Sequence, residues 1–119
     1  MAAKSPLPRL DDIRDAIAAI EADVRGLAFA DYQADRRLRW SVERGIEIIS
    51  EASRHIPDDL KARHPEVPWR NVAGIGNVLR HEYMEVADDA VWAVVQDHLP
   101  MLRAAVLAMI AAVEREEGG

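Results

Sequence analysis

The sequence predicts an all-α, up-and-down bundle of about five helices, formed by a single domain over residues 1–119. Apolar residues recur every three or four positions through most of the chain, and no segment alternates apolar and polar residues as a half-buried strand does. Half of the 119 residues are hydrophobic, which is enough for one core. There is also no internal repeat, so the length excludes a multidomain enzyme.

The first two helices are predicted over 10–27 and 35–55. Gly26 can end the first, because glycine tolerates the left-handed backbone of a helix end, and Asp35 is a suitable N-cap for the second. The apolar stripe of the first helix is Leu10, Ile13, Ile17, Ile20, Val24 and Leu27. The stripe of the second is Leu38, Val42, Ile46, Ile49 and Ser53.

The second half of the chain continues the same pattern. A turn, "PDDLKARHP", begins at Pro57, and a third long helix follows over 68–83 with Trp69, Val72, Ile75 and Leu79 on its inner face. Asp88 or Asp89 should cap a fourth helix, "AVWAVVQDHL". Pro100 should then restart the chain as a last helix, which carries Leu102, Val106, Met109 and Val113.

Several large apolar residues fall just off these stripes, namely Trp40, Ile48, Trp92 and Leu107. They indicate either a thick core or a face that remains for a second copy of the chain.

Composition narrows the class of protein. No run approaches the roughly 18 to 20 apolar residues that cross a bilayer, and "MAAKSPLPRLDDIRD" lacks the apolar stretch of a signal peptide, so we expect a cytoplasmic protein. The absence of cysteine excludes disulfides and thiol chemistry.

The net charge of −6 is unevenly distributed. The middle segment, 36–80, has nine Lys or Arg against six Asp or Glu and is flanked by acidic segments. The overall charge argues against bulk attraction to nucleic acid, whereas the middle segment could bind one polyanion or simply be a solvated helix face.

Chemistry-bearing residues gather in "RNVAGIGNVLRHEYMEV", residues 70–86. The four histidines, at 55, 64, 81 and 98, show no metal-binding spacing, so no metal or other cofactor is expected. On an ideal helix Asn77 and His81 share a face, with Arg80 about 100° and Tyr83 about 200° away from His81. A helix end near residue 82, or a partner's copy of the segment, could bring them together; otherwise His81 is an ordinary hydrogen-bonded histidine and Tyr83 a residue at the core edge.

The stretch "RGIEIISEASRHIPDDLKARHPEVPWRNVAGIGNVLRHEY", followed by "VWAVVQDHLPML", resembles the HepT-like branch of the HEPN superfamily. This resemblance implies a homodimeric helical bundle with a metal-independent ribonuclease site between protomers. It also implies a toxin–antitoxin system of the type VII kind, in which the partner is a minimal nucleotidyltransferase antitoxin and the substrate is an RNA such as tRNA or mRNA.

The family motif is an arginine, four residues, a histidine, any residue and a tyrosine. His81 and Tyr83 match it, Asn77 matches the polar residue after the arginine, and Gly76 stands in place of the arginine itself. The resemblance implies that His81 moves a proton, that Asn77 supports the site and that Tyr83 accepts AMP (AMPylation), while Arg80 is the nearby cation that could hold phosphate charge. Gly76 keeps two alternatives open: a catalytically inactive HEPN domain that binds a nucleotide, RNA or the nucleotidyltransferase, and a plain helical dimerisation module.

Overall fold

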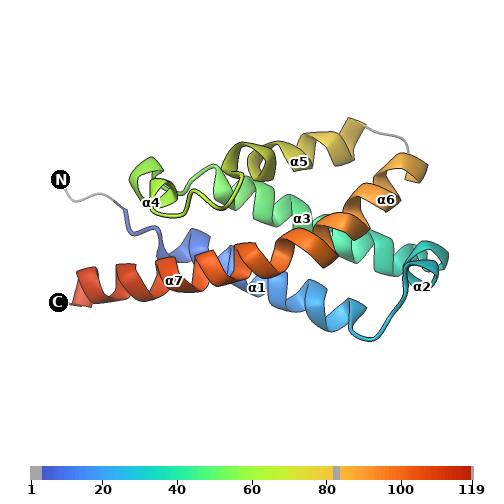
Figure 1. Ribbon diagram of the computed structural model, residues 1–119, viewed down its shortest axis with the longest axis horizontal. Coiled ribbons are helices and arrows are strands. Elements are labelled where there is room, and N and C mark those ends of the chain that lie inside the picture. The colour runs from blue at the N-terminus through green and yellow to red at the C-terminus, as the bar shows by residue number, and fades with distance from the viewer. Residues whose placement is uncertain (1–3, 82–83, 119) are drawn as a thin grey trace.

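A computed structural model of the protein describes residues 4–81 and 84–118, with the side chains of 4–76 and 88–118. The described residues form helices and no strands, and the chain runs up and down the length of an elongated bundle of 48 × 28 × 23 Å (Figure 1). The prediction of an all-α fold is confirmed. The start of α1 and the end of α7 lie toward one end of the bundle, and the end of α5 and the start of α6 lie toward the other (Figure 1).

The first two long helices are α1, Leu7–Val24, and α3, Arg36–Ser53. Gly26 follows α1 with a φ of 77°, in the left-handed region predicted for it. Asp35 caps α3 as predicted, because its carboxylate accepts the N–H of Leu38 at 3.1 Å. The predicted stripes supply much of the core, in which Ile13, Ile17 and Val42 are fully buried.

Two short helices were not predicted: α2, Phe29–Ala34, and α4, Asp58–Ala62. Both are too short for an apolar period to show in the sequence. A local contact marks α2, where the Asp31 carboxylate accepts the N–H of Ala28 at 2.8 Å. Its aromatic residues Phe29 and Tyr32 pack with Trp92, with ring centroids 6.0 and 5.3 Å from that of Trp92, respectively, and 6.4 Å from each other.

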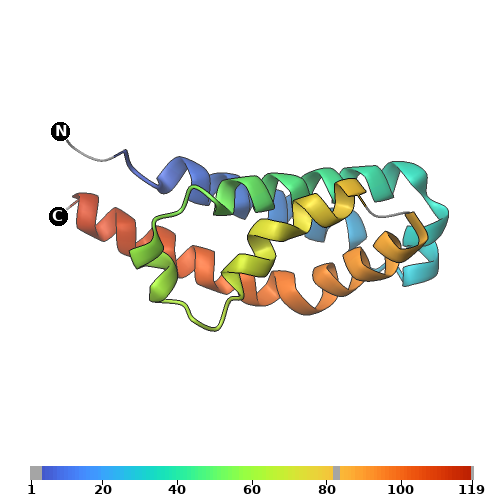
Figure 2. The ribbon, with the colours of Figure 1, turned by 90° about the horizontal axis from the view of Figure 1, so that it is seen from above.

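The helix that carries the motif is α5, Trp69–His81, and it packs along α3 (Figure 2). Its first residue is fixed by two bonds of the Trp69 indole N–H, to the carbonyl oxygens of Lys61 and His64 at 3.1 Å each. The position of α5 is thus set at its start by the α4 connector and along its length by α3.

The remainder of the chain is continuous helix, through α6, Met84–Ala93, a single π-helical turn η1, Val94–His98, and α7, Leu99–Gly118. The predicted N-cap at Asp88 or Asp89 is therefore wrong, since both lie inside α6. The predicted restart at Pro100 is also wrong. The wide turn carries the helix through the proline, and the N–H of Leu99 donates to the carbonyl of Val94.

The wide turn also keeps one face buried. Three residues spaced four apart are buried: Val91, Val95 and Leu99. In a regular α-helix each step of four residues rotates about 40° past a full turn, so such residues would drift off the buried face. The wide turn absorbs this drift.

The stretch Asp88–Gly118 is long and apolar enough, by length and composition, to cross a membrane. In this fold it is partly buried as a core helix, with Leu102, Val106 and Met109 inside the bundle.

A cluster of polar groups lies where α2, α3 and α6 meet. Arg39 approaches Asp88 at 3.9 Å, and both side chains are largely buried. Burial, followed by the nearby Asp88 carboxylate, raises the pKa of Glu43, and burial likewise raises the pKa of Tyr32. The Tyr32 hydroxyl has no hydrogen-bond partner among the described residues. Holding this cluster in place therefore costs some electrostatic free energy.

Gly45→Ala should destabilise the protein. A Cβ at position 45 would lie 2.7 and 2.9 Å from Cδ1 and Cγ1 of the buried Ile20, and such overpacking typically costs about 1 to 3 kcal/mol. Gly74→Ala is the matched control, because a Cβ there meets nothing within 4 Å and alanine should stabilise α5 by about 0.5 to 1 kcal/mol. Urea unfolding of both variants checks this, and equal shifts in midpoint would contradict it.

Glu43→Gln should raise the free energy of unfolding at pH 7. The raised pKa of Glu43 means that the folded state favours its protonated form, so the ionised carboxyl costs stability at neutral pH. The proton-linked stabilisation is complete below the ordinary glutamate pKa and is lost as pH rises through the raised pKa. The advantage of the variant should therefore shrink as pH falls toward about 4. Thermal unfolding at several pH values, with exposed Glu117→Gln as control, tests this; a pH-independent difference would refute it.

Candidate functional site

The predicted site residues Asn77, Arg80 and His81 fall in the last turns of α5, which ends at His81, and α6 begins at Met84. The side chains of Asn77, Arg80 and His81 lie outside the described residues, and Tyr83 lies outside them entirely. The surroundings of these positions are described up to Gly76. They show how α3 holds the helix that carries the motif.

The hydroxyl of Ser50 links α3 to α5. Ser50, 2% exposed, donates from Oγ to the carbonyl of Ala73 at 2.7 Å and accepts the N–H of Gly76 at 3.3 Å. These contacts lie on one face of α5, since positions 73 and 76 are separated by three residues. We call this contact line between Ser50 and α5 the α3–α5 seam.

The seam leaves little room for a side chain at position 76. A Cβ at Gly76 would lie 3.0 Å from Oγ and 3.3 Å from Cβ of Ser50, so a larger residue requires Ser50 to move. Ser50 thus crowds the position at which the side chain of a motif arginine at 76 would begin. The sequence pattern identified the missing arginine but not the residue from α3 that faces the gap.

Arg54 was also missed by sequence reasoning, since it lies on a different helix from the motif. From the end of α3 its guanidinium donates to the Ala73 carbonyl through Nε at 3.2 Å and Nη2 at 2.8 Å. Its Nη1 lies 3.5 Å from Glu51. The sequence feature that could have identified Arg54 is its position four residues after Ser50, because residues four apart share a helix face.

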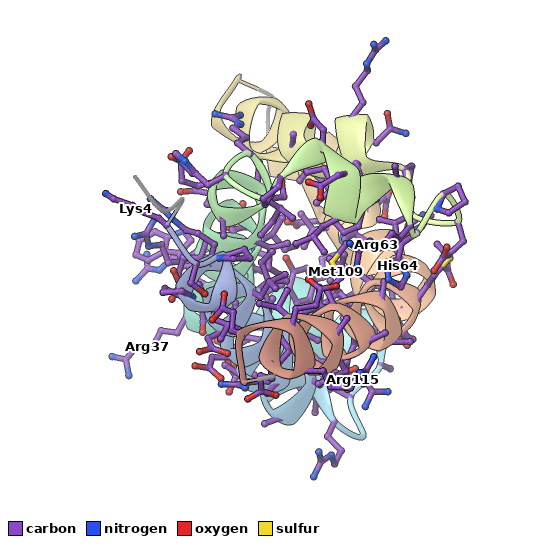
Figure 3. The ribbon with its side chains drawn as sticks, turned by 90° about the vertical axis from the view of Figure 1, so that its left-hand side faces the viewer. Lys4, Arg37, Arg63, His64, Met109 and Arg115 are labelled. Carbon is purple, nitrogen blue, oxygen red and sulfur yellow. The ribbon has the colours of Figure 1, made fainter. Side chains whose placement is uncertain are left out.

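Beyond the seam, Lys4, Arg9 and His55 line an open groove of about 670 Å³ between the N-terminal segment and the end of α3. Figure 3 shows Lys4 on the outside of the bundle. His55 bonds Glu51 at 3.1 Å, and this bond is the largest cause of the lowered pKa of the Glu51 carboxyl. The groove combines two fixed positive charges with a histidine, which suits an anionic ligand.

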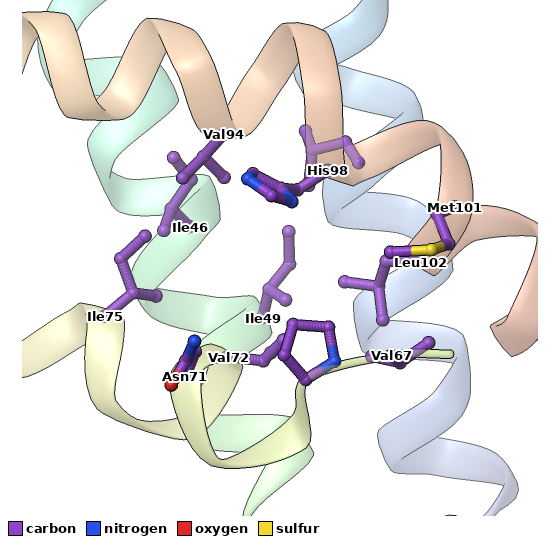
Figure 4. Close-up of a pocket in the computed structure, with 12 residues that line it drawn as sticks. Ile46, Ile49, Val67, Asn71, Val72, Ile75, Val94, His98, Met101 and Leu102 are labelled. Carbon is purple, nitrogen blue, oxygen red and sulfur yellow. The ribbon is translucent and has the colours of Figure 1, made fainter. Parts of the chain in front are cut away.

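An apolar pocket of about 250 Å³ opens on another face of α5, between α3 and the η1–α7 region (Figure 4). Asn71 and His98 supply polar groups from opposite sides of it, while Ile49, Val72 and Ile75 are among its apolar walls. The α5 residues of this pocket differ from Ala73 and Gly76, which face the seam.

No group of three or more histidine, aspartate or glutamate side chains suited to a metal ion occurs within the part of the chain that the structure describes. His64 is paired with Glu66 at 3.2 Å, and Glu66 has a lowered pKa caused first by a backbone hydrogen bond and then by His64.

Comparison with known proteins identifies the family to which these features belong. A family model described as ribonuclease HepT-like matches residues 13–109. A protein of Thermococcus cleftensis named "Probable ribonuclease HepT" is 40% identical over 94 residues, covering 79% of this chain and 86% of that protein.

Two further relatives carry the name "Putative RNase". The one from Caldanaerobacter subterraneus subsp. tengcongensis is 32% identical over 83% of this chain and 88% of its own length. The one from Methanocaldococcus jannaschii is 29% identical over 79% and 86%, respectively. No solved structure gives a significant match.

Proposed function

Because the chain belongs to the HepT-like ribonuclease family, we propose that it is a metal-independent RNase toxin of a type VII-like toxin–antitoxin pair. The observation that carries this proposal is the family match over 13–109, which includes the whole of α5 and its histidine. The substrate is RNA, and the protein acts in the cytoplasm as a single domain.

The proposed site consists of His81, Asn77 and Arg80. Cleavage starts when the ribose 2′-hydroxyl attacks the adjacent phosphorus, while His81 takes or returns a proton and the 5′-oxygen leaves. A guanidinium stabilises the charge that develops on the phosphate oxygens, because its planar fork matches them and stays charged. Arg80 is the first candidate for this role, and Asn77 orients the phosphate or the imidazole.

The site is proposed to lie between two protomers related by a two-fold axis. Large apolar side chains remain exposed on the bundle, with Trp40 59% and Leu107 46% exposed. Such residues are usual at the centre of a protein interface. Their exposure supports a second copy of the chain as the occupant.

The proposed partner is a minimal nucleotidyltransferase antitoxin that transfers AMP from ATP to the hydroxyl of Tyr83 and releases pyrophosphate. An adenylate two residues after His81 adds bulk and negative charge next to an anion site. It would exclude RNA by steric overlap and like-charge repulsion.

A second candidate function rests on the Ser50–Gly76 contact. Since Gly76 replaces the motif arginine and Ser50 crowds the position where its side chain would begin, the protein is alternatively an inactive HEPN domain that binds RNA, a nucleotide or the nucleotidyltransferase. Cleavage of RNA by the purified protein separates the two candidates. Binding without cleavage would favour the second.

His81→Ala should reduce RNA cleavage by about 100- to 10,000-fold, the usual contribution of a general acid or base. His98→Ala is the control, since it removes a histidine of the apolar pocket. Rates on a single-stranded RNA, with the 2′-deoxy oligonucleotide as an uncleavable substrate, measure the effect. An unchanged rate for His81→Ala would refute the role of His81 as proton carrier.

Sedimentation of both variants should give twice the 13.3 kDa chain mass. A monomer would rule out a site shared between two protomers.

Tyr83→Phe should retain RNA cleavage but no longer be silenced by a nucleotidyltransferase antitoxin, because the phenol oxygen that accepts AMP is lost. Incubation with the antitoxin and ATP, followed by mass spectrometry, measures the added AMP. Tyr32→Phe serves as the control, since its ring is buried in the core. AMP found on a residue other than Tyr83 would exclude Tyr83 as the acceptor.

A further inference from the structure

The apolar pocket between α3, α5 and the η1–α7 region has the form of a site for a small ligand (Figure 4). Its deepest residues belong to the core, since Ile46, Ile49 and Leu102 are each at most 4% exposed. Nearer the surface, Val72 and Ile75 are only partly buried. A cavity with apolar walls and a few polar groups is the usual form of a site for a small molecule.

Two polar side chains face each other across this pocket. Asn71, in the first turn of α5, and His98, the last residue of η1, lie on opposite sides of it (Figure 4). Both are exposed, and neither side chain has a hydrogen-bond partner among the described residues. The amide of Asn71 has donors beside an acceptor, and a neutral imidazole has one of each. Both groups therefore keep their hydrogen-bonding capacity for a ligand.

The π-helical turn brings His98 to the pocket. A wide turn has more residues than an α-helical turn, so residues four or five apart stay on one side of the helix. Val94 at the start of η1 and His98 at its end accordingly both line the pocket. Single π-helical turns within α-helices occur frequently at functional sites.

The lining determines which kind of ligand fits. The described residues of the pocket include no carboxylate, lysine or arginine, so a charged group inside it would lose its hydration without gaining a charged partner. The volume of about 250 Å³ is below the roughly 300 to 1,000 Å³ of sites for drug-sized ligands. A small, uncharged heteroaromatic ring meets these conditions, because its faces are apolar and its hydrogen-bonding atoms lie on its edges.

Among such rings, adenine matches the amide of Asn71. Adenine presents an amino donor next to the acceptor N7, and an asparagine amide can pair with both at once. Guanine presents two acceptors at the same edge, so one of the two bonds would be lost. The imidazole of His98 can donate to, or accept from, an atom on the opposite edge of the ring.

We propose that this pocket binds the adenine ring of a free nucleoside, and that Asn71 and His98 recognise its two edges. A free nucleoside fits better than a nucleotide or an RNA strand, because the described lining has no lysine or arginine for a phosphate. The inference does not depend on the ribonuclease function. The ligand contacts α3, α5 and α7 together, so its binding stabilises the packing of the motif helix.

Adenosine should bind the purified protein with a Kd of about 0.1 mM, as expected for a ligand of this size. At roughly tenfold excess over that Kd it should raise the Tm by about 3 to 6 °C. Guanosine should bind at least about tenfold more weakly, because it mismatches the amide. ATP should bind within about threefold of adenosine, because its phosphates stay in solvent. Titration calorimetry and thermal unfolding measure these effects.

Asn71→Ala and His98→Ala should each weaken adenosine binding by about tenfold, the effect of losing a base-edge contact. Asn71→Asp should do the same, since it loses the donor and keeps the acceptor. Gln96→Ala is the matched control, because Gln96 is an exposed amide of η1 that does not line the pocket. Its affinity for adenosine should equal that of the parent.

A second ligand separates edge recognition from a change in the shape of the pocket. Indene, a bicyclic hydrocarbon without hydrogen-bonding atoms, should bind the parent, Asn71→Ala and His98→Ala equally. Val72→Phe extends a wall into the cavity and should abolish binding of adenosine and indene alike.

A folded parent that binds no adenosine at about fifty times the expected Kd would overturn the proposal. Equal affinities of the parent and Asn71→Ala for adenosine, or of the parent for adenosine and guanosine, would overturn the recognition of the adenine edge. A 2′-O-methylated oligoadenylate that binds more tightly than adenosine would overturn the free nucleoside as the occupant and indicate an RNA strand.

Discussion

The hydroxyl of Ser50 sets the position of the helix on which the proposed chemistry depends. It is buried between α3 and α5 and uses both its donor and its acceptor on the backbone of α5. Each hydrogen bond contributes about 1 kcal/mol, and an unpaired buried partner would cost more than that. The contact also favours a glycine at 76, because a Cβ there would crowd Ser50 and make it shift. One small polar residue thus helps to fix the motif helix and disfavours a larger residue at position 76.

This constraint bears on the chemistry of the site. A ribonuclease that uses no metal must stabilise phosphate charge with side chains alone, and the geometry of a guanidinium suits this better than that of an ammonium group. From α3, Arg54 crosses to α5 and donates to the carbonyl of Ala73. Together with Ser50 it ties the end of α3 to the middle of the motif helix.

Much of the fold could be predicted from the sequence because helical periodicity and capping are local properties. Gly26 ended the first helix and Asp35 began the second where expected, and the long apolar stripes supplied the core. The errors arose where tertiary contacts decide. Asp88 looked like a cap but lies inside α6 near Arg39, and α2 depends on packing of its aromatic rings against Trp92. Only the part of the candidate site that lies on α5 was predicted from the sequence. Ser50 and Arg54 were missed because their meaning depends on which helix lies beside α3.

The π-helical turn at Val94–His98 has a consequence for comparing this chain with its relatives. A wide turn arises when a helix accommodates one extra residue without breaking, so α6 and α7 follow separate rotational phases. A helical wheel drawn with a single period across the turn would assign the residues of α7 to the wrong sides. A relative with a regular turn here would align with a one-residue gap inside an unbroken helix. That gap would record a change in winding, with no loop gained or lost.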